Sequence, residues 1–569
     1  MRYRVLACDY DGTIAHHGVV SEETVRALKK AAQSGRKLVL VTGRELHDLL
    51  AAFPEADVFD CIVAENGGVL YEPATREERP LAPPPPPALI STLHERGVHP
   101  LSIGRVVVAT WEPHETVVLE AIRDLELDLH VSFNKGAVMV LPDGVNKKSG
   151  LEAALHRLGL SLHNTVGVGD AENDHAFLTV CECAVAVANA LHSVKEECDW
   201  VTAQERGAGV EELVERLLED DLESLGAKLT RHHVLLGRRD DGSEVTLAPY
   251  GSVVLVAGGS GSGKSTAVTG LLERLSDRGY QVCIIDPEGD YEGFDSAVIA
   301  GSPEQPPDAD QVLQILRRAE GNAVVNLLGV PAHDRPQFFL HVLSRLQELR
   351  ASTGRPHWLV LDEAHHMLGS DFEPAGLALP QDLGSLLFIT VHPDQLQRAL
   401  LERVTHFIGV GTDAVSALES FARALGTAQP EIGAAPEQQG QGLVWFRDHP
   451  RAERLTMPPG SVSRRRHRRK YAHGELGPDK SFYFRGSDGR LNLRAHNLVV
   501  FNTIAEGVDD ETWLYHLRRG HYSEWLRDSI KDPELADQVA TVESDASLSP
   551  AASRRRIRDL VDRRYTLPA

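Results

Sequence analysis

The chain has 569 residues, of which 42% are hydrophobic and 25% charged, and this ordinary globular composition excludes a disordered or fibrous protein. Its formal net charge of −23 excludes a surface that coats nucleic acid or anionic lipid as a whole, so any such contact needs a local basic patch. The six cysteines are scattered, which excludes a disulfide scaffold and a cysteine zinc site. At roughly 100–200 residues per domain, the length predicts about three or four domains.

The first region, residues 1–222, alternates short apolar runs with amphipathic helices. Apolar runs at Arg4–Cys8 and Lys37–Val41 predict strands, and Ser21, followed by two glutamates, predicts the N-cap of the helix between them. The last helix of the region is expected to end near Asp220. This alternation predicts an α/β fold, a parallel sheet with helices on both faces.

An insertion over about 80–145 interrupts this region. The prolines Pro83–Pro87 predict a stiff, extended connector. A strand at Val106–Thr110, a helix at Pro113–Leu125 and a strand at Ala137–Leu141 then predict a small α+β cap.

Residues 228–458 carry a second α/β pattern. It opens at Val234–Leu236, and its strongest strand, Val253–Ala257, runs directly into a glycine-rich loop. Further strands are expected at Val282–Ile285, Ala323–Leu327, Trp358–Leu361, Leu386–Thr390 and Phe407–Val410. The pattern predicts a second parallel sheet, in a P-loop domain.

The rest of the chain is a basic linker, residues 459–474, and a C-terminal segment, residues 475–569. Arg464–Lys470 contains six Lys or Arg and one His, so it is either a solvated linker or a segment that neutralises a phosphate backbone. The C-terminal segment is expected to be small and mainly helical, and the pattern indicates no function for it. Its last thirty or so residues are rich in Ser, Ala and Arg and predict one loosely held helix.

Four motifs in the first region point to phosphate-ester chemistry. Asp9 and Asp11 directly follow the first strand, where one carboxylate can attack phosphorus and the other can act as acid and base. Thr42-Gly43-Arg44 ends the second strand, and its hydroxyl and backbone N–H can hold a phosphate oxygen. Lys147 supplies a cation for a phosphoryl transition state. The acids of Gly167-Val-Gly-Asp170-Ala-Glu-Asn173-Asp174 suit a magnesium ion together with Asp9.

In this order and spacing, the motifs resemble the haloacid-dehalogenase (HAD) phosphohydrolases, in the branch with the phosphoglycolate, sucrose-phosphate, trehalose-phosphate and Cof-type phosphatases. The resemblance covers about residues 1–220. The same branch is also resembled by two further segments, Glu65-Asn66-Gly67-Gly68 and Val187-Ala188-Asn189-Ala190. It implies a Mg²⁺-dependent phosphatase in which Asp9 forms an aspartyl-phosphate and Asp11 is the general acid and base.

The same resemblance implies the remaining roles. Thr42 and Lys147 would steady the phosphoryl group. Mg²⁺ would be held by Asp9, Asp170 and the Asp11 carbonyl. Its ligands would be oriented by Asp174 and Asn173. The cap would choose the substrate, and Asn134 and Lys135 are candidates for contacting the leaving group, with an ordinary polar turn as the alternative.

A second constellation points to nucleotide hydrolysis. Gly258-Gly-Ser-Gly261-Ser-Gly263-Lys264-Ser265-Thr266 lies between a strand and a helix, and its backbone N–H groups would bind phosphates. Lys264 would reach the β and γ oxygens and Ser265 would coordinate Mg²⁺. At the end of a later strand, Asp362 would order that Mg²⁺ shell and Glu363 would activate water. These paired acids predict ATP hydrolysis rather than nucleotide binding alone.

Together with Ile284-Ile-Asp286-Pro-Glu288-Gly-Asp290-Tyr291, these motifs resemble the HerA/FtsK-type ATPases, which are hexameric DNA-pumping motors, over about residues 230–455. Family members usually carry Gln after the third strand, where this chain has Thr390-Val391-His392. His392 is therefore a candidate γ-phosphate sensor or only a turn residue. The resemblance implies a homo-oligomer with a trans-acting arginine, for which Arg398 and Arg403 are candidates by position only.

The leading interpretation is a fusion of a phosphatase for a phosphorylated small molecule with an ATP-hydrolysing domain. A second interpretation has both parts acting on nucleic acid, as a DNA-linked motor with a phosphatase or as an end-healing kinase and phosphatase; Asp362-Glu363 favours the motor. A third is an ATP-gated scaffold, against which the intact acids and Lys147 argue.

No run approaches about 18 uncharged apolar residues and no apolar signal core is present, so a cytoplasmic protein without membrane contact is expected.

Overall fold

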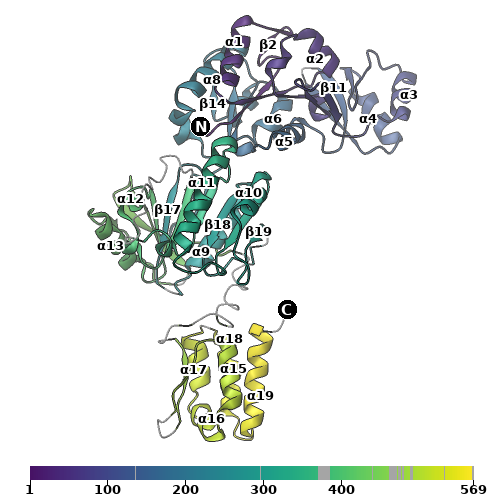
Figure 1. The fold of residues 1–569 in the computed structure, drawn as a ribbon. Coiled ribbons are helices and arrows are strands. Elements are labelled where there is room, and N and C mark those ends of the chain that lie inside the picture. Colours follow the sequence, from purple (N-terminus) through teal and green to yellow (C-terminus); the bar gives the residue numbers. More distant parts are fainter. Residues whose placement is uncertain are drawn as a thin grey trace.

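The structure is a computed structural model of the chain, drawn in Figure 1. It describes residues 1–566 apart from 135, 260, 292, 295, 370–384, 439, 461–470, 472–475, 477–479, 487–490 and 531. The basic run Arg464–Lys470 and the cap residue Lys135 therefore lie outside the described residues. Within the described residues, no helix is long and apolar enough to cross a membrane.

The N-terminal unit is built on an eight-stranded sheet. The order of its strands is β14 (Trp200–Val201), β13 (Cys183–Ala186), β12 (Thr165–Gly169), β1 (Val5–Asp9), β4 (Lys37–Val41), β5 (Cys61–Ala64), β6 (Val69–Glu72) and β7 (Glu77–Pro80). From β14 to β5 all neighbours are parallel, and β6 and β7 add an antiparallel edge. The predicted parallel sheet is confirmed.

Helices cover both faces of this sheet (Figure 1). Helix α1 (Glu22–Gln33) begins where it was predicted, because the Ser21 side chain accepts the Thr24 N–H at 3.1 Å. It packs against α8 (Arg206–Asp220), whose end was also predicted. On the other side lies α5 (Lys147–Leu158), whose first residue is a predicted site residue.

The cap is a four-stranded antiparallel sheet in the order β10 (Leu129–Asn134), β11 (Ala137–Pro142), β9 (Val108–Trp111) and β8 (Ser102–Ile103). Helices α3 (Pro87–Glu95) and α4 (Glu115–Asp124) pack on one face of it. Helix α3 and strand β10 were not predicted, and Pro87 starts a helix instead of ending the extended connector. Proline is well tolerated at a first helical position, because its missing N–H has no helical partner there.

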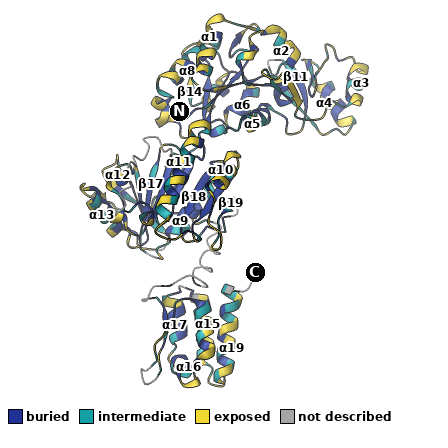
Figure 2. Cartoon of the chain, in the orientation of Figure 1, coloured by how far each residue is buried: buried dark blue, intermediate teal, exposed yellow. Residues whose placement is uncertain are grey.

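The second unit contains the larger sheet. Its strands follow the order β16 (Glu244–Leu247), β15 (Val234–Arg238), β26 (Arg451–Thr456), β25 (Gln441–Phe446), β23 (His406–Val410), β17 (Val253–Ala257), β22 (Ser385–Thr390), β21 (Trp358–Leu361), β18 (Val282–Asp286), β20 (Asn322–Asn326) and β19 (Ala297–Ala300). From β23 to β19 the strands are parallel, as predicted. Figure 2 shows the central strands of both sheets as buried.

The two sheets meet at the starts of their strands. Arg4, just before β1, donates from Nη2 to the carbonyl of Arg350 in α11 (Arg335–Thr353) at 3.2 Å. His163, just before β12, stacks on Tyr280, just before β18, with ring centroids 3.7 Å apart. The strands therefore run away from this junction in both units. Open parallel sheets bind ligands at the carboxyl ends of their strands, so the two sites face opposite ways, roughly 30 Å or more apart for strands rising about 3.3 Å per residue.

The C-terminal unit is small and mainly helical, as predicted (Figure 1). It consists of a hairpin, β27 (Phe482–Phe484) with β28 (Leu493–Ala495), and the helices α15 (Leu498–Gly507), α16 (Asp510–Leu517), α17 (His521–Asp528), α18 (Pro533–Ser544) and α19 (Pro550–Val561). The structure has the predicted final helix, α19, but the expectation that this helix is loosely held is wrong. Ile557 and Val561 of α19 are buried in the same core as Trp513, because these apolar residues are spaced along one face of an otherwise arginine-rich helix.

Candidate active sites

The first site lies at the carboxyl end of the N-terminal sheet. Asp9 ends β1, and Asn146 caps α5 so that Lys147 is its first residue. Lys147 Nζ donates to Asp9 Oδ1 at 2.5 Å and to Asp174 Oδ1 at 2.6 Å. All three side chains are at most 5% exposed. The structure thus brings Asp9 together with two residues that lie more than a hundred positions further along the chain.

Burial dominates the electrostatics of this group. It raises the pKa of Asp9 to about 7, with a further increase from the Asp174 charge that Lys147 opposes. Burial alone would lower the pKa of Lys147, but the carboxylates of Asp174 and Asp9 raise it above its usual range. The lysine is therefore a fixed cation between two acids.

The acids also meet the requirements of a hard cation. One carboxylate oxygen each of Asp9, Asp170 and Asp174 lies within 4.8 Å of the other two. The Asp174 side chain is held by the backbone N–H groups of Asp170 and Ala171, at 2.8 and 2.9 Å. Mg²⁺ takes oxygen ligands of this kind and keeps some of its waters, so the predicted metal residues fit the ion.

Arg44 is the residue whose surroundings differ most from the sequence-based expectation. It was predicted to contact a phosphate, but its guanidinium forms a two-pronged ion pair with Asp11, at 2.6 and 2.7 Å. Its charge also lies over the Tyr10 ring, 5.1 Å from the centroid. Thr42 is buried, and its Oγ1 accepts the Arg44 N–H at 3.1 Å. The pair could not be predicted from sequence, because both residues matched separate motifs with separate roles.

The cap covers this site. The face of the cap sheet that carries no helix is the one that is turned toward the site. An Asn66–Ser132 contact at 3.4 Å joins the core to β10, and the Asn173 side chain donates to Asn66 Oδ1 at 3.2 Å. The Met139 sulfur of β11 approaches Gly43. Asn134 ends β10, and its Oδ1 is buried without a hydrogen-bond partner among the described residues. Asn134 and Asn173 thus present polar groups on the two sides of the cap–core boundary.

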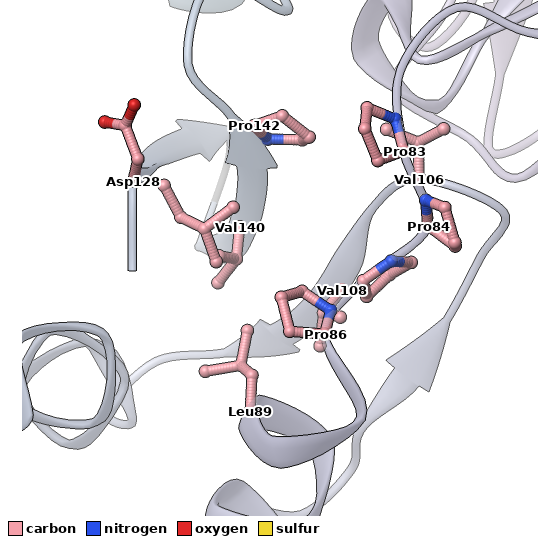
Figure 3. A pocket seen from close by; sticks show the side chains of 11 residues that line it. Pro83, Pro84, Pro86, Leu89, Val106, Val108, Asp128, Val140 and Pro142 are labelled. Carbon is pink, nitrogen blue, oxygen red and sulfur yellow. The ribbon is translucent and has the colours of Figure 1, made fainter. Parts of the chain in front are cut away.

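A separate cavity of about 170 Å³ lies within the cap (Figure 3). It is apolar, with Asp128 as its acidic lining residue; the others are Pro83, Pro84, Pro85, Pro86, Leu89, Val106, Val108, Leu129, Val140 and Pro142. None of the predicted site residues lines it. It lies on the helix side of the cap sheet, where Leu89, Val108 and Val140 form the cap core.

The second site is the phosphate-binding loop after β17. Gly258, Gly261 and Gly263 have φ values of 156°, 78° and 95°, a region that favours glycine. Helix α9 (Lys264–Asp277) starts immediately after them, so Ser265 and Thr266 lie in its first turn. Lys264 Nζ donates to the carbonyls of Gly258 and Gly259, at 2.8 and 2.9 Å. The loop is thus formed, with its lysine turned onto its own backbone.

The predicted acids lie on neighbouring strands of this sheet. Asp362 and Glu363 follow β21, and Asp286 ends the adjacent β18. Burial and the Asp362 charge raise the pKa of Asp286 to about 7. Sequence reasoning gave no role to His365, yet its Nδ1 lies 3.5 Å from a Glu363 oxygen.

His365 also links the acids to the candidate sensor. Its Nδ1 lies 3.1 Å from Thr390 Oγ1, and its ring lies 5.5 Å from that of His392. Burial and the neighbouring histidines lower the pKa of His365 to about 4. The His365 ring therefore lies between Glu363 and His392.

Comparisons with known proteins agree with this geometry. The haloacid dehalogenase-like hydrolase family matches residues 6–102 and 99–214, and the central domain of helicase HerA matches residues 251–347. A phosphoglycolate phosphatase of Methanothermobacter thermautotrophicus is 32% identical over 225 residues, which are 38% of this chain and 99% of the relative. Phosphoglycolate phosphatase 2 of Saccharolobus solfataricus is 30% identical over 38% of this chain and 92% of the relative. A crystal structure of a haloacid dehalogenase-like hydrolase from Bacteroides thetaiotaomicron is 18% identical, covers 38% of this chain and 99% of that one, and has a TM-score of 0.34.

The chain belongs to the haloacid dehalogenase-like hydrolases, and it joins a phosphatase unit of that family to a HerA-type ATPase domain. The predicted fusion is confirmed. The two phosphatase relatives match only the N-terminal 38% of this chain, so they say nothing of the ATPase or C-terminal units.

Proposed function

We propose that the N-terminal unit is a Mg²⁺-dependent phosphatase that hydrolyses small phosphate monoesters through an aspartyl-phosphate on Asp9. The observation that carries the proposal is the buried contact of Lys147 with both Asp9 and Asp174, beside Asp170. This arrangement provides a nucleophile, a fixed cation and oxygen ligands at one strand edge.

Two balanced steps follow from these residues. In the first, an Asp9 carboxylate oxygen forms a bond to phosphorus, the ester P–O bond breaks, and protonated Asp11 gives its proton to the leaving oxygen. In the second, the Asp11 carboxylate takes a proton from water, whose oxygen attacks phosphorus and releases phosphate and Asp9. In the second step the Arg44 pair would orient the Asp11 carboxylate toward the attacking water.

Asp9, Asp170 and the Asp11 carbonyl would hold Mg²⁺, and Asp174 and Asn173 would orient its ligands. Bound there, the ion would offset negative charge on the phosphoryl oxygens. Thr42, with Gly43 beside it, and Lys147 would bind those oxygens from the protein side. Asn134 would contact the leaving group from the cap.

Phosphate release by the Lys264→Ala protein tests the substrate class, because this variant removes the ATPase background. The panel is phosphoglycolate, sugar phosphates, and oligonucleotides with 3′- or 5′-phosphates. The names of the relatives support a small ester, and we expect Mg²⁺-dependent release from one. Preference for oligonucleotide ends would contradict the small-ester proposal.

For the second unit we propose ATP hydrolysis in a homo-oligomer. Lys264 would exchange the two loop carbonyls for β and γ phosphate oxygens, Ser265 and Asp362 would hold Mg²⁺, and Glu363 would activate water. His392 would sense the γ-phosphate. Mass photometry with and without ATP tests the assembly, and a monomer under both conditions would contradict it.

The HerA match favours one further candidate, a DNA-associated motor that carries the phosphatase. It predicts that duplex DNA stimulates ATP hydrolysis with a steep salt dependence. Equal ATPase rates with and without DNA at low salt would exclude it.

A further inference from the structure

A group of metal-binding residue types lies at the junction between the two units, away from both catalytic sites. His163 and Glu182 come from the phosphatase unit, and His232 comes from the segment that leads into β15. One ring nitrogen of each histidine and one carboxylate oxygen of Glu182 lie within 4.8 Å of one another. His163 and Glu182 are buried and His232 is half-buried.

The second nitrogen of each histidine is occupied by a backbone carbonyl. His163 Nε2 lies 2.6 Å from the Arg278 carbonyl, across the junction, and His232 Nε2 lies 2.9 Å from the Cys181 carbonyl. A carbonyl only accepts hydrogen bonds, so both Nε2 atoms carry protons, and Nδ1 is the ring atom that can bind a cation in each histidine. Histidines that bind metals characteristically donate their other N–H to a carbonyl or carboxylate in this way.

Between His163 and Glu182, a ring nitrogen faces a carboxylate oxygen directly. His163 Nδ1 lies 2.9 Å from Glu182 Oε2. A neutral imidazole with its proton on Nε2 faces this carboxylate with a lone pair, so two acceptors meet unless a cation or a second proton lies between them. Arg2 holds the other oxygen of Glu182, at 2.5 Å, which leaves Oε2 directed toward the histidines.

The nearby His357 differs in this respect. Its ring lies 5.5 Å from that of His163, but its Nδ1 accepts the backbone N–H of Gln281 at 2.8 Å. Its lone pair is therefore used, and it is no ligand through that atom. The Tyr280 hydroxyl, by contrast, donates to Glu182 Oε2 at 2.8 Å, so it lies beside the carboxylate oxygen that faces His163.

We propose that His163, Glu182 and His232 bind a divalent transition metal ion at the junction of the two units. Two imidazoles and a carboxylate suit zinc, which takes four ligands, better than Mg²⁺, which prefers oxygen alone. The fourth ligand is the Tyr280 oxygen or a water. The metal joins the starts of β12 and β13 to the segment entering the ATPase sheet, so its role is to hold the two units together.

Metal analysis of the full-length protein tests the proposal. Protein from zinc-supplemented cells is dialysed against metal-free buffer without chelator or ATP, and zinc is measured by plasma mass spectrometry. We expect about one zinc per chain in the wild type, and at least about a tenfold loss in Glu182→Gln and His232→Ala. His192→Ala is the matched control, since it removes a histidine from an exposed His–Glu pair and should keep the metal. Asp170→Asn should also keep it, which separates this site from the phosphatase acids.

A second readout does not depend on the folding of variants. Wild-type protein stripped of zinc and loaded with Co²⁺ should show ligand-field absorption typical of a tetrahedral site with nitrogen ligands, and zinc should abolish it. Wild-type protein that holds no zinc above background and gives no cobalt band would overturn the proposal, leaving a doubly protonated His163 paired with Glu182. Equal zinc in the wild type, Glu182→Gln and His232→Ala would also overturn it.

Discussion

The lysines of the two candidate sites have different hydrogen-bond partners. In the phosphatase unit, Lys147 lies between the carboxylates of Asp9 and Asp174, whereas in the ATPase unit Lys264 lies against the carbonyls of Gly258 and Gly259. Both lysines are nearly fully buried at the first turn of a helix that follows a parallel strand. Lys147 is therefore held by two carboxylates, and Lys264 is held in part by carbonyls that phosphate oxygens would replace.

This difference indicates how each site prepares for phosphate. The phosphatase site is organised by its own charges, and preorganised charge needs no rearrangement during the reaction. The P-loop lysine must leave two carbonyls when phosphates arrive. We therefore expect changes around Lys147 to affect both chemistry and stability, and changes at Lys264 to affect ATP hydrolysis alone.

The largest expected effect comes from Asp9→Asn. It removes the nucleophile and should lower kcat for ester hydrolysis by at least about 10³-fold. ATP hydrolysis should not change, since the two sites lie on opposite edges of the joined sheets. Loss of ATP hydrolysis in a folded Asp9→Asn protein would contradict the separation of the two sites.

Lys147→Met should have the next largest effect. It leaves two buried carboxylates without their cation, so we expect a loss of about 10²–10³-fold in kcat and of about 3–5 kcal/mol in the free energy of unfolding. Urea unfolding and steady-state kinetics measure the two effects. Lys148→Met is the control, because Lys148 is exposed and forms a long ion pair with Glu152, at 3.9 Å; comparable losses in both variants would contradict a special role of Lys147.

Arg44→Ala distinguishes positioning of Asp11 from binding of substrate. If Arg44 orients the Asp11 carboxylate, kcat should fall by about 10-fold with little change in KM. Arg44→Lys should not restore it, since an ammonium cannot reproduce the two-pronged pair. A raised KM with unchanged kcat would instead indicate that Arg44 contacts substrate. Arg26→Ala, which removes an exposed pair with Glu23, should have no effect.

The smallest effect is expected at the junction. In Gly354→Ala the new Cβ would lie 2.5 Å from the Asn164 side chain, which is held by its bond to the Arg2 carbonyl. Gly144 has nearly the same φ, 76° against 73°, but its Cβ would meet nothing within 4 Å. The thermal midpoint of Gly354→Ala should therefore fall further than that of Gly144→Ala, by the equivalent of about 1–3 kcal/mol. Equal midpoints would mean that the junction is not tightly packed.

Much of the fold followed from the sequence, because apolar runs and motif residues coincide at strand ends. β4, β17 and β21 begin and end where the pattern predicted. Strand β10 was missed although its sequence, Leu-His-Val-Ser-Phe-Asn, alternates apolar and polar residues as a half-buried strand does. The C-terminal helix α19 was misjudged because composition hides the spacing of Ile557 and Val561.

The candidate sites were predicted as sets of residues but not as sets of contacts. Each motif places its side chains at a strand end, so Asp9, Lys147 and Asp174 were expected near one another. Pairing between motifs depends on how loops approach in three dimensions. The Asp11–Arg44 pair and the link from His365 to Glu363 arise in this way, and so does the whole junction, where no local pattern distinguishes His163 from a surface histidine.

The central claim is that Asp9 carries the phosphoryl group, and trapping of the phosphoenzyme tests it most directly. Full-length protein is mixed with Mg²⁺ and a hydrolysed ester, quenched in acid, digested and analysed by peptide mass spectrometry. We expect one acid-stable phosphoryl group on the peptide that contains Asp9, and none in Asp9→Asn. Turnover in which the phosphoryl group is found on another residue, or with Asp9→Asn as active as the wild type, would contradict it.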